Sequence, residues 1–196
     1  MRDSRASNPS AEPFRAVLAI LPRWILVVAL AGASALRAQT TTSPPGESEV
    51  KATFVLNFIR FVTWSGIQGE NSADLPVCAL ANSDFANAIK LAVSGKLVQG
   101  RAISFTLDVA PDPSRCRVLI VDVAQYPIAA APLHAVSAAP VLTIGNGPGF
   151  IEIGGMFELI LENRKIRFDA NLNAVRQAGL SMNAYVFQLS RNLAKK

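Results

Sequence analysis

Histidine and cysteine are scarce in this chain of 196 residues, which has one histidine, His134, and two cysteines, Cys78 and Cys116. A structural zinc site takes four such ligands, so the three present cannot close one without help from carboxylates. His134 lies among alanine, proline and leucine, with no serine or carboxylate at the spacing of a catalytic triad. We therefore expect no metal site, no catalytic residues and no cofactor, and a protein that is not an enzyme.

A phosphate-binding loop is also missing, although glycines at residues 145–149 follow the strand-like segment VLTIG. A dinucleotide fingerprint would have to open there into a helix that binds phosphate at its N-terminus. Instead Pro148 intervenes, and strand-like sequence resumes at Phe150. These glycines are typical of turns that need positive φ. Four carboxylates could supply a glycosidase pair, but we expect them to be solvated because they fall in or beside hairpin strands: Glu152, Glu158, Glu162 and Asp169.

Basic residues are concentrated at the start of the chain. Five of the 19 lie in the first 38 residues beside only two acidic ones, so the rest of the chain carries +2 of the net charge of +5. No run of lysine and arginine with interleaved aromatics remains there. Nucleic-acid binding needs such a positive footprint, so we expect no nucleic-acid partner.

The first 38 residues have the order of a signal peptide. An arginine-bearing start precedes the uncharged segment Trp24–Leu36, and small residues follow up to Ala38. This segment of 13 residues is shorter than a membrane-spanning helix, which needs about 20. We expect export to the periplasm, cleavage after Ala38 or Ala35, and a disordered linker over residues 39–48. The alternative is a retained anchor, if Arg23 snorkels and lengthens the span.

Cys78 and Cys116 each lie at or beside a strongly strand-like segment, LPVCALA and RVLIVDV. In the periplasm such a pair is expected to form a disulfide. The closed loop of about 39 residues would then stabilise the fold by about 4 kcal/mol, by restricting the unfolded chain. The alternative is two separate buried thiols.

Strand-like and helix-like segments alternate along residues 49–194, which is typical of α/β proteins. We expect a single domain in which helices flank a mixed β-sheet, with a C-terminal β-hairpin followed by two helices. The hairpin turns at Asn163-Arg164, Asn171 caps the next helix and Gly179 ends it. The final helix places its apolar residues on one face: Met182, Tyr185, Val186, Leu189 and Leu193.

The first expected helix, Glu49–Trp64, is apolar on nearly every side. Its polar residues Thr53, Asn57 and Arg60 form one narrow stripe. Such a helix must bury two of its sides, and a single sheet face covers one. The second side is expected to pack within the domain or to dock on a partner.

The segment VKATFVLNFIRFVTW resembles the opening motif of the YfiR family, KAxFLYNFxxFVxWP. Thr53 replaces the usual alanine of that motif, Val55 and Leu56 replace leucine and tyrosine, and Ser65-Gly66 replaces proline, but none of these changes breaks a helix. Further landmarks follow in the family's order over about residues 49–193: Cys78 with Leu80, Gly95-Lys96, Gly100-Arg101, Cys116, VLTIG, Gly149-Phe150, Gly154-Gly155-Met156 and IRFDANLNAVRQAGLSMN.

The resemblance implies a periplasmic α/β domain with no known catalytic activity. Its best-described relatives repress a membrane-bound diguanylate cyclase by binding its periplasmic sensor domain. We therefore expect this chain to bind an inner-membrane signalling protein, the sensor domain of a cyclase or a kinase, with a homodimer as a further option. The sequence alone identifies neither the partner nor the signal.

Two surfaces are candidates for this binding function. The first helix would orient a partner through Asn57, Arg60 and Trp64, since tryptophan and arginine are over-represented in interfaces, although Trp64 would equally fill a core. The alternative is a small-molecule sensor with a cleft beyond the strand ends, at Gly145, Asn146 and Phe150. An undetected hydrolase is a third reading, and no nucleophile and base pair supports it.

Overall fold

The computed structural model describes residues 45–64, 74–81, 83–107 and 112–194. The expected signal peptide, residues 1–38, lies outside the described residues, as does most of the expected linker. The first described helix, α2, spans Glu47–Phe61 and begins two residues before the expected start of the domain at Glu49. Within the described ranges, no helix is long and apolar enough to cross a membrane.

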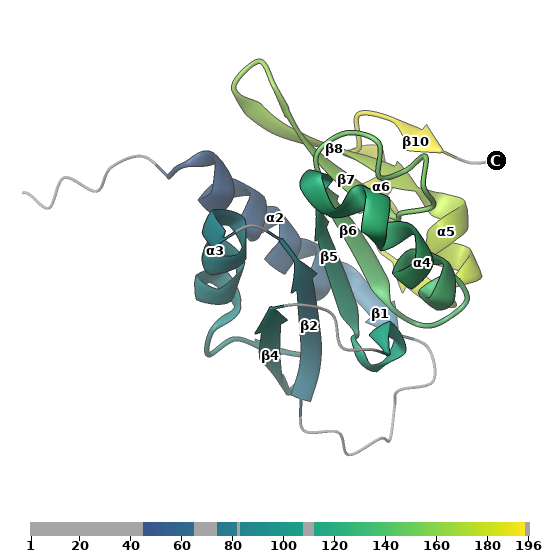
Figure 1. Ribbon diagram of the computed structural model, residues 1–196, viewed down its shortest axis with the longest axis horizontal. Coiled ribbons are helices and arrows are strands. Elements are labelled where there is room, and N and C mark those ends of the chain that lie inside the picture. Colours follow the sequence, from purple (N-terminus) through teal and green to yellow (C-terminus); the bar gives the residue numbers. More distant parts are fainter. Residues whose placement is uncertain (1–44, 65–73, 82, 108–111, 195–196) are drawn as a thin grey trace, which may run out of the picture. The chain divides into compact units, whose positions relative to one another are not determined.

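Eight strands form one mixed sheet in the order β10-β8-β7-β6-β5-β2-β4-β3 (Figure 1). Strands β4, β2, β5, β6 and β7 are parallel to one another, whereas β3 and β8 run antiparallel to β4 and β7. This sheet confirms the predicted α/β fold. The strands are β2 (Asp74–Leu80), β3 (Leu97–Val98), β4 (Arg101–Leu107), β5 (Val118–Asp122), β6 (Leu142–Asn146), β7 (Phe157–Glu162), β8 (Lys165–Asn171) and β10 (Leu193–Ala194).

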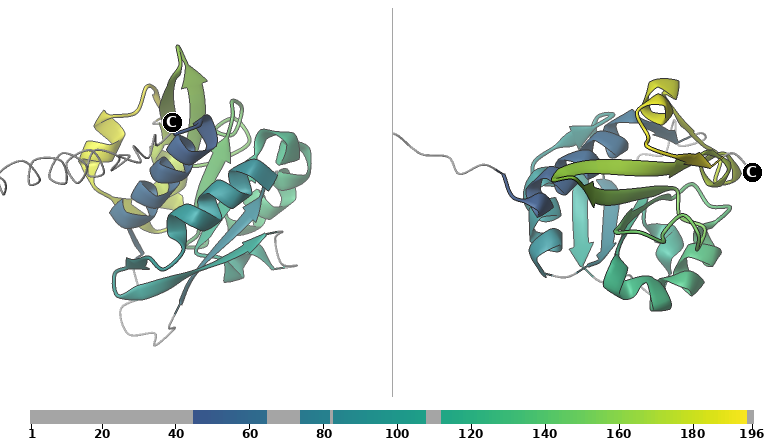
Figure 2. Two further views of the ribbon diagram at one scale, coloured as in Figure 1. Left: turned by 90° about the vertical axis from the view of Figure 1, so that its left-hand side faces the viewer. Right: turned by 90° about the horizontal axis from the view of Figure 1, so that it is seen from above.

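Helices cover both faces of the sheet, because its central strands are apolar on both sides. On β5, Val118 and Ile120 pack in the core with α2 and α3 (Ser83–Val93), while Leu119 and Val121 pack with α4 (Tyr126–Val136). Figure 2 shows α2 and α3 side by side on one face and α4 on the other. Two short 3₁₀ helices, Pro113–Arg115 and Val123–Gln125, flank β5.

Much of helix α2 packs against its own chain, as in the first of the two expected options. Val55 and Ile59 are fully buried, and the ring of Phe58 stacks on Phe157 of β7 with centroids 4.6 Å apart. Phe168 of β8 meets the same ring edge-on at 5.1 Å. The aromatic side chains of α2 therefore belong largely to the core.

The helix ends earlier than expected. Residues Val62–Trp64 form a short strand, β1, which pairs antiparallel with β9, Leu180–Met182, in a separate two-stranded sheet. The physical reason is that Val62 leaves the helical region, with φ −82° and ψ 143°, and pairs with Met182. Sheet pairing with a distant segment thus replaces the last helical turn.

The hairpin turn confirms the prediction from Asn163-Arg164, because both residues have positive φ, 50° and 60°, as a type I′ turn requires. Asn171 then caps α5, Leu172–Gln177, by accepting a hydrogen bond from the Ala174 N–H at 3.1 Å. Gly179 follows with φ 67°, the left-handed conformation in which a helix ends, so the expected stop of this helix is confirmed.

The final helix is shorter than expected. It is α6, Ala184–Gln188, and Leu193 lies in strand β10 instead of on the helix. The backbone N–H of Arg191 donates to the carbonyl of Phe168 in β8 at 2.8 Å, so sheet pairing takes over from the helix. Tyr185 and Leu189 are consequently left on the surface.

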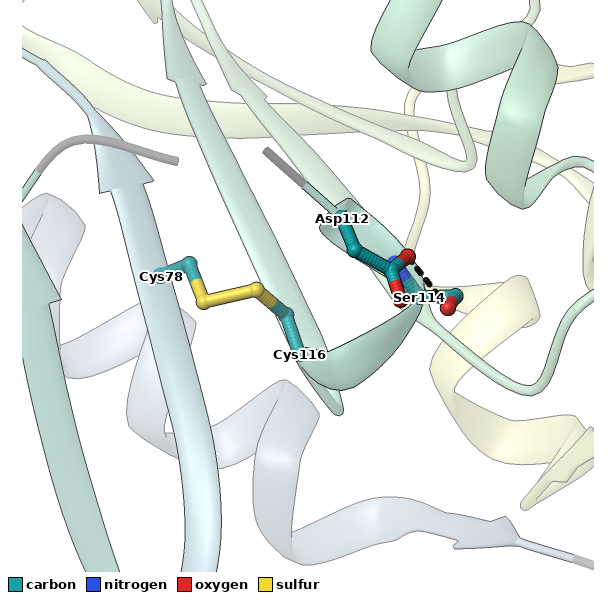
Figure 3. The surroundings of a disulfide bond; sticks show 4 residues. All are labelled: Cys78, Asp112, Ser114 and Cys116. Atoms are coloured by element: carbon teal, nitrogen blue, oxygen red, sulfur yellow. Dashed lines mark hydrogen bonds between the residues drawn. A yellow bond between two sulfur atoms is a disulfide. The ribbon is translucent and has the colours of Figure 1, made fainter. Parts of the chain in front are cut away.

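Cys78 and Cys116 form the predicted disulfide, which joins β2 to the segment just before β5 (Figure 3). Their Cα atoms are 5.9 Å apart, and both residues are buried. Nearby, Asp112 accepts hydrogen bonds from the Oγ and the N–H of Ser114, at 2.5 and 3.0 Å, and thereby caps the 3₁₀ helix before Cys116. These bonds from Ser114 lower the pKa of Asp112.

Candidate functional site

An apolar groove lies between α5, β9, α6 and β10, and we call it the C-terminal groove. Its volume is about 590 Å³, which is within the usual range of ligand-binding clefts. Arg176 is the charged residue on its wall. The apolar lining consists of Leu172, Val175, Leu180, Met182, Phe187 and Leu193.

Four very short elements surround the groove. Asn183 caps α6 by accepting a hydrogen bond from the Tyr185 N–H at 2.9 Å, but the helix has only five residues. Tyr185 on this helix is 64% exposed, and Leu189 just after it is 59% exposed. Neither residue lines the groove, but both leave apolar surface exposed beside it.

The segment that closes the groove is anchored by an acidic residue of β8. The Arg191 guanidinium donates from Nε and Nη2 to the two Asp169 oxygens, at 3.0 and 2.6 Å, and from Nη1 to Glu162 at 3.0 Å. Asn192 adds its backbone N–H and its Nδ2 to the same carboxylate, at 3.1 and 3.3 Å. Burial raises the pKa of Asp169, but the bonds from Arg191 and Asn192 outweigh it and hold that pKa below its ordinary value.

The groove adjoins the C-terminal end of α2. Met182, which lines the groove, pairs with Val62 immediately after the helix. The residue before Val62 is Phe61, which is 52% exposed, and Arg60 beside it is also exposed. The β1–β9 pairing therefore connects the exposed end of α2 with the groove.

Of the three residues expected to face a partner, one is exposed. Arg60 is exposed and Asn57 is half-buried, both on α2. Trp64 is 5% exposed and packs in the main core. Its position therefore matches the alternative expectation, in which Trp64 fills the core. Its indole N–H has no hydrogen-bond partner among the described residues.

The expected small-molecule site at Gly145, Asn146 and Phe150 is not an open cleft. Phe150 is fully buried, and a Cβ on Gly145 would overlap its ring. Gly145 is thus needed for close packing, whereas Gly147 and Gly149 do have the positive φ expected of turns, 117° and 96°.

Tyr126 is tied to the same loop, because its hydroxyl donates to the Gly147 carbonyl at 2.7 Å. Burial raises the pKa of Tyr126, and the negative charge of nearby carboxylates raises it further.

Asn146 instead belongs to a chain of polar contacts at the carboxyl end of the parallel strands. Its Oδ1 accepts from Lys51 Nζ of α2 at 2.6 Å, and its Nδ2 donates to Asp122 of β5 at 3.1 Å. Lys51 also pairs with Glu47 one turn earlier, at 2.5 Å, and Asp122 accepts from the Val123 N–H. These contacts fix α2 against the ends of β5 and β6.

The expectation that the hairpin carboxylates are solvated is wrong for two of the four. Glu158 is buried and accepts hydrogen bonds from the backbone N–H groups of Phe150 and Ile151, at 2.6 and 3.2 Å. Asp169 is buried in its cluster with Arg191. Both therefore organise loops and are not free to act as a glycosidase pair.

The described residues contain no group of histidine, cysteine, aspartate and glutamate that could hold a metal ion. His134 is exposed on α4. Sequence reasoning does not find the groove, because it assigns two of the apolar lining residues, Met182 and Leu193, to one face of a single longer helix. The single available signal was Asn183, a good capping residue that marks the start of a short helix.

Comparison with known proteins agrees with this fold. A family model described as YfiR/HmsC-like matches residues 48–191. Among solved structures, the chain is similar to a conserved domain protein from Vibrio cholerae, with 10% identity, a TM-score of 0.52 and 77% of this chain covered. The match spans 61% of that protein's length, and at this identity it shows a shared fold alone. Because the family match runs from α2 to Arg191, the chain belongs to the YfiR/HmsC-like family.

Proposed function

We propose that this chain is an exported periplasmic regulatory protein that binds an inner-membrane signalling partner, such as a diguanylate cyclase, and holds it in one state. Membership of the YfiR/HmsC-like family supports a regulatory role. The observation that carries the proposal is the C-terminal groove, an apolar hollow of about 590 Å³ next to exposed aromatic side chains. The Cys78–Cys116 disulfide is consistent with an oxidising compartment.

The docking surface that we propose combines the groove with the exposed end of α2. An apolar or aromatic side chain of the partner would enter the groove between Phe187 and Leu193, because buried aromatic anchors dominate interface energetics. Arg60 and Arg176 would face acidic groups of the partner at the rim, where charges act mainly on orientation and association rate. The partner's site is thus expected to be an apolar projection flanked by carboxylates.

A small-molecule sensor is the second candidate function, and the volume of the C-terminal groove is the observation that supports it. Clefts of roughly 300–1,000 Å³ hold metabolite-sized ligands, and an apolar lining with one cationic residue suits an amphipathic anion. Native mass spectrometry of protein purified gently from periplasm separates the two candidates. A retained mass of a few hundred daltons, to an order of magnitude, would favour the sensor.

The decisive experiment blocks the groove. Ala184 lines it and is exposed, so Ala184→Arg places a long charged side chain in the groove without removing core contacts. The matched control is Ala135→Arg, at an exposed alanine of α4. A photo-crosslinker at Gln188, which also lines the groove, should label a membrane protein that carries a cyclase or kinase domain, and Ala184→Arg alone should abolish this labelling. Labelling that survives Ala184→Arg would place the interface elsewhere.

A further inference from the structure

The 191–194 segment forms one wall of the C-terminal groove, through Leu193. Its strand β10 pairs with β8 over two residues only, Leu193 with Ala170 and Ala194 with Asn171. So short a ladder contributes little stability by itself, since even isolated hairpins are marginal in water. The position of Leu193 therefore depends on the residues that precede it.

Those residues are fixed by one carboxylate. Arg191 and Asn192 donate four hydrogen bonds to the Asp169 carboxylate. The two from Arg191 are bidentate, a geometry that makes a guanidinium–carboxylate ion pair strong and fixes its orientation. Two backbone bonds lie beside this cluster: the Arg191 N–H donates to Phe168 O, and the Ala170 N–H donates to Asn192 O at 3.0 Å. Asp169 itself sits on a regular strand whose neighbour Phe168 is in the core, so it is a fixed anchor.

We propose that Asp169 and Arg191 are positioning residues of the groove: their ion pair holds the 191–194 segment in place and thereby sets Leu193 as a wall of the binding surface. This inference rests on the groove being the binding surface of the proposed function. Neither residue lines the groove, so they act through Leu193 and not by contact with the bound molecule. Without the pair, the segment leaves β8 and the groove opens on that side.

Hydrogen exchange measures the first half of this proposal. In Arg191→Gln, the amide of Ala170 should exchange faster, since its acceptor is Asn192 O, while the amides of Ile120 and Ile144 in β5 and β6 keep their protection. Arg191→Lys keeps the charge but loses the bidentate fork, so it should restore part of the protection. The control is Arg167→Gln, at an exposed arginine of β8, the strand that carries Asp169. Unchanged exchange at Ala170, or faster exchange at all three amides, would overturn the proposal.

Binding of an apolar anion, 1-anilinonaphthalene-8-sulfonate, measures the second half without any partner protein. Arg191→Gln should weaken its binding about tenfold, or about 1.4 kcal/mol, because one wall is lost. Leu193→Ser should weaken binding to a similar extent while the Ala170 amide stays protected, and Ala184→Arg should abolish it. Failure of the dye to bind wild type, or equal binding to Arg191→Gln and wild type, would overturn the proposal. Crosslinking to the partner is a separate readout, so failure of the regulatory role is distinguishable from failure of this inference.

Discussion

Buried polar side chains connect parts of this molecule that are far apart in sequence. Lys51 and Asn146 are 95 positions apart, yet they join α2 to the end of β6. Glu158 holds the loop at Phe150, and Asp169 holds Arg191. Each of these carboxylates and amides makes more than one hydrogen bond, so these buried or half-buried groups keep their hydrogen-bond partners.

Asn146→Ala tests the contact between α2 and the sheet. The substitution removes an acceptor from buried Lys51 and a donor to Asp122, so the free energy of unfolding should fall by about 1–3 kcal/mol. Urea denaturation monitored by circular dichroism measures this change. Asn87→Ala is the control, because Asn87 is exposed on α3, and it should change stability by less than about 0.5 kcal/mol. Equal effects of the two substitutions would mean that the Lys51 contact contributes nothing to stability.

The lowered pKa of Asp169 predicts a pH dependence of stability. A carboxyl group whose pKa is lower in the folded than in the unfolded state stabilises the fold above the unfolded value, about 3.9, and loses this contribution as pH falls through the folded value. Asp169→Asn should therefore lower the free energy of unfolding by about 2 kcal/mol at neutral pH. Below about pH 4 the difference from wild type should shrink. Denaturation curves from pH 7 to pH 3 measure this, and a constant difference would contradict the role of the ionised carboxylate.

At the scale of elements, the features that sequence predicted are those with local causes. The Asn163-Arg164 turn, the Asn171 cap and Gly179 each depend on residues within a few positions, and the structure contains all three. Strands β1, β9 and β10 have two or three residues each and exist only through pairing with distant partners. No local pattern predicts such strands, so the groove that they surround was not predicted either.

The disulfide links the central strand β2 to the segment that leads into β5, so its removal should act on the whole domain. Replacing Cys78 and Cys116 together by alanine should lower the free energy of unfolding by about 4 kcal/mol, because the unfolded chain gains freedom over a long loop. Non-reducing peptide mapping of the wild type should find the two cysteines linked. Chemical denaturation of the wild type with and without reductant is the matched comparison, and identical curves would show that the bond does not stabilise the fold.

At the scale of the whole molecule, the proposal requires export. The uncharged segment Trp24–Leu36 is shorter than a membrane-spanning helix, so we expect cleavage by a signal peptidase. N-terminal sequencing of protein from a periplasmic extract should therefore begin near Gln39. Recovery of protein that retains Met1 in the membrane fraction would contradict cleavage and would support the alternative of a retained anchor.

The end of α2 provides the test of regulation in the intact system. Arg60 is exposed on that helix, and charge reversal at an interface rim weakens association, whereas an exposed substitution usually changes folding stability by less than about 0.5 kcal/mol. Arg60→Glu should thus leave export and the melting transition normal and release the partner, which raises cyclic-di-GMP if that partner is a cyclase. Arg115→Glu, at an exposed arginine of the 3₁₀ helix before Cys116, is the matched control and should leave signalling unchanged. Normal signalling in Arg60→Glu would remove α2 from the docking surface, and a lowered melting transition would make Arg60 a structural residue.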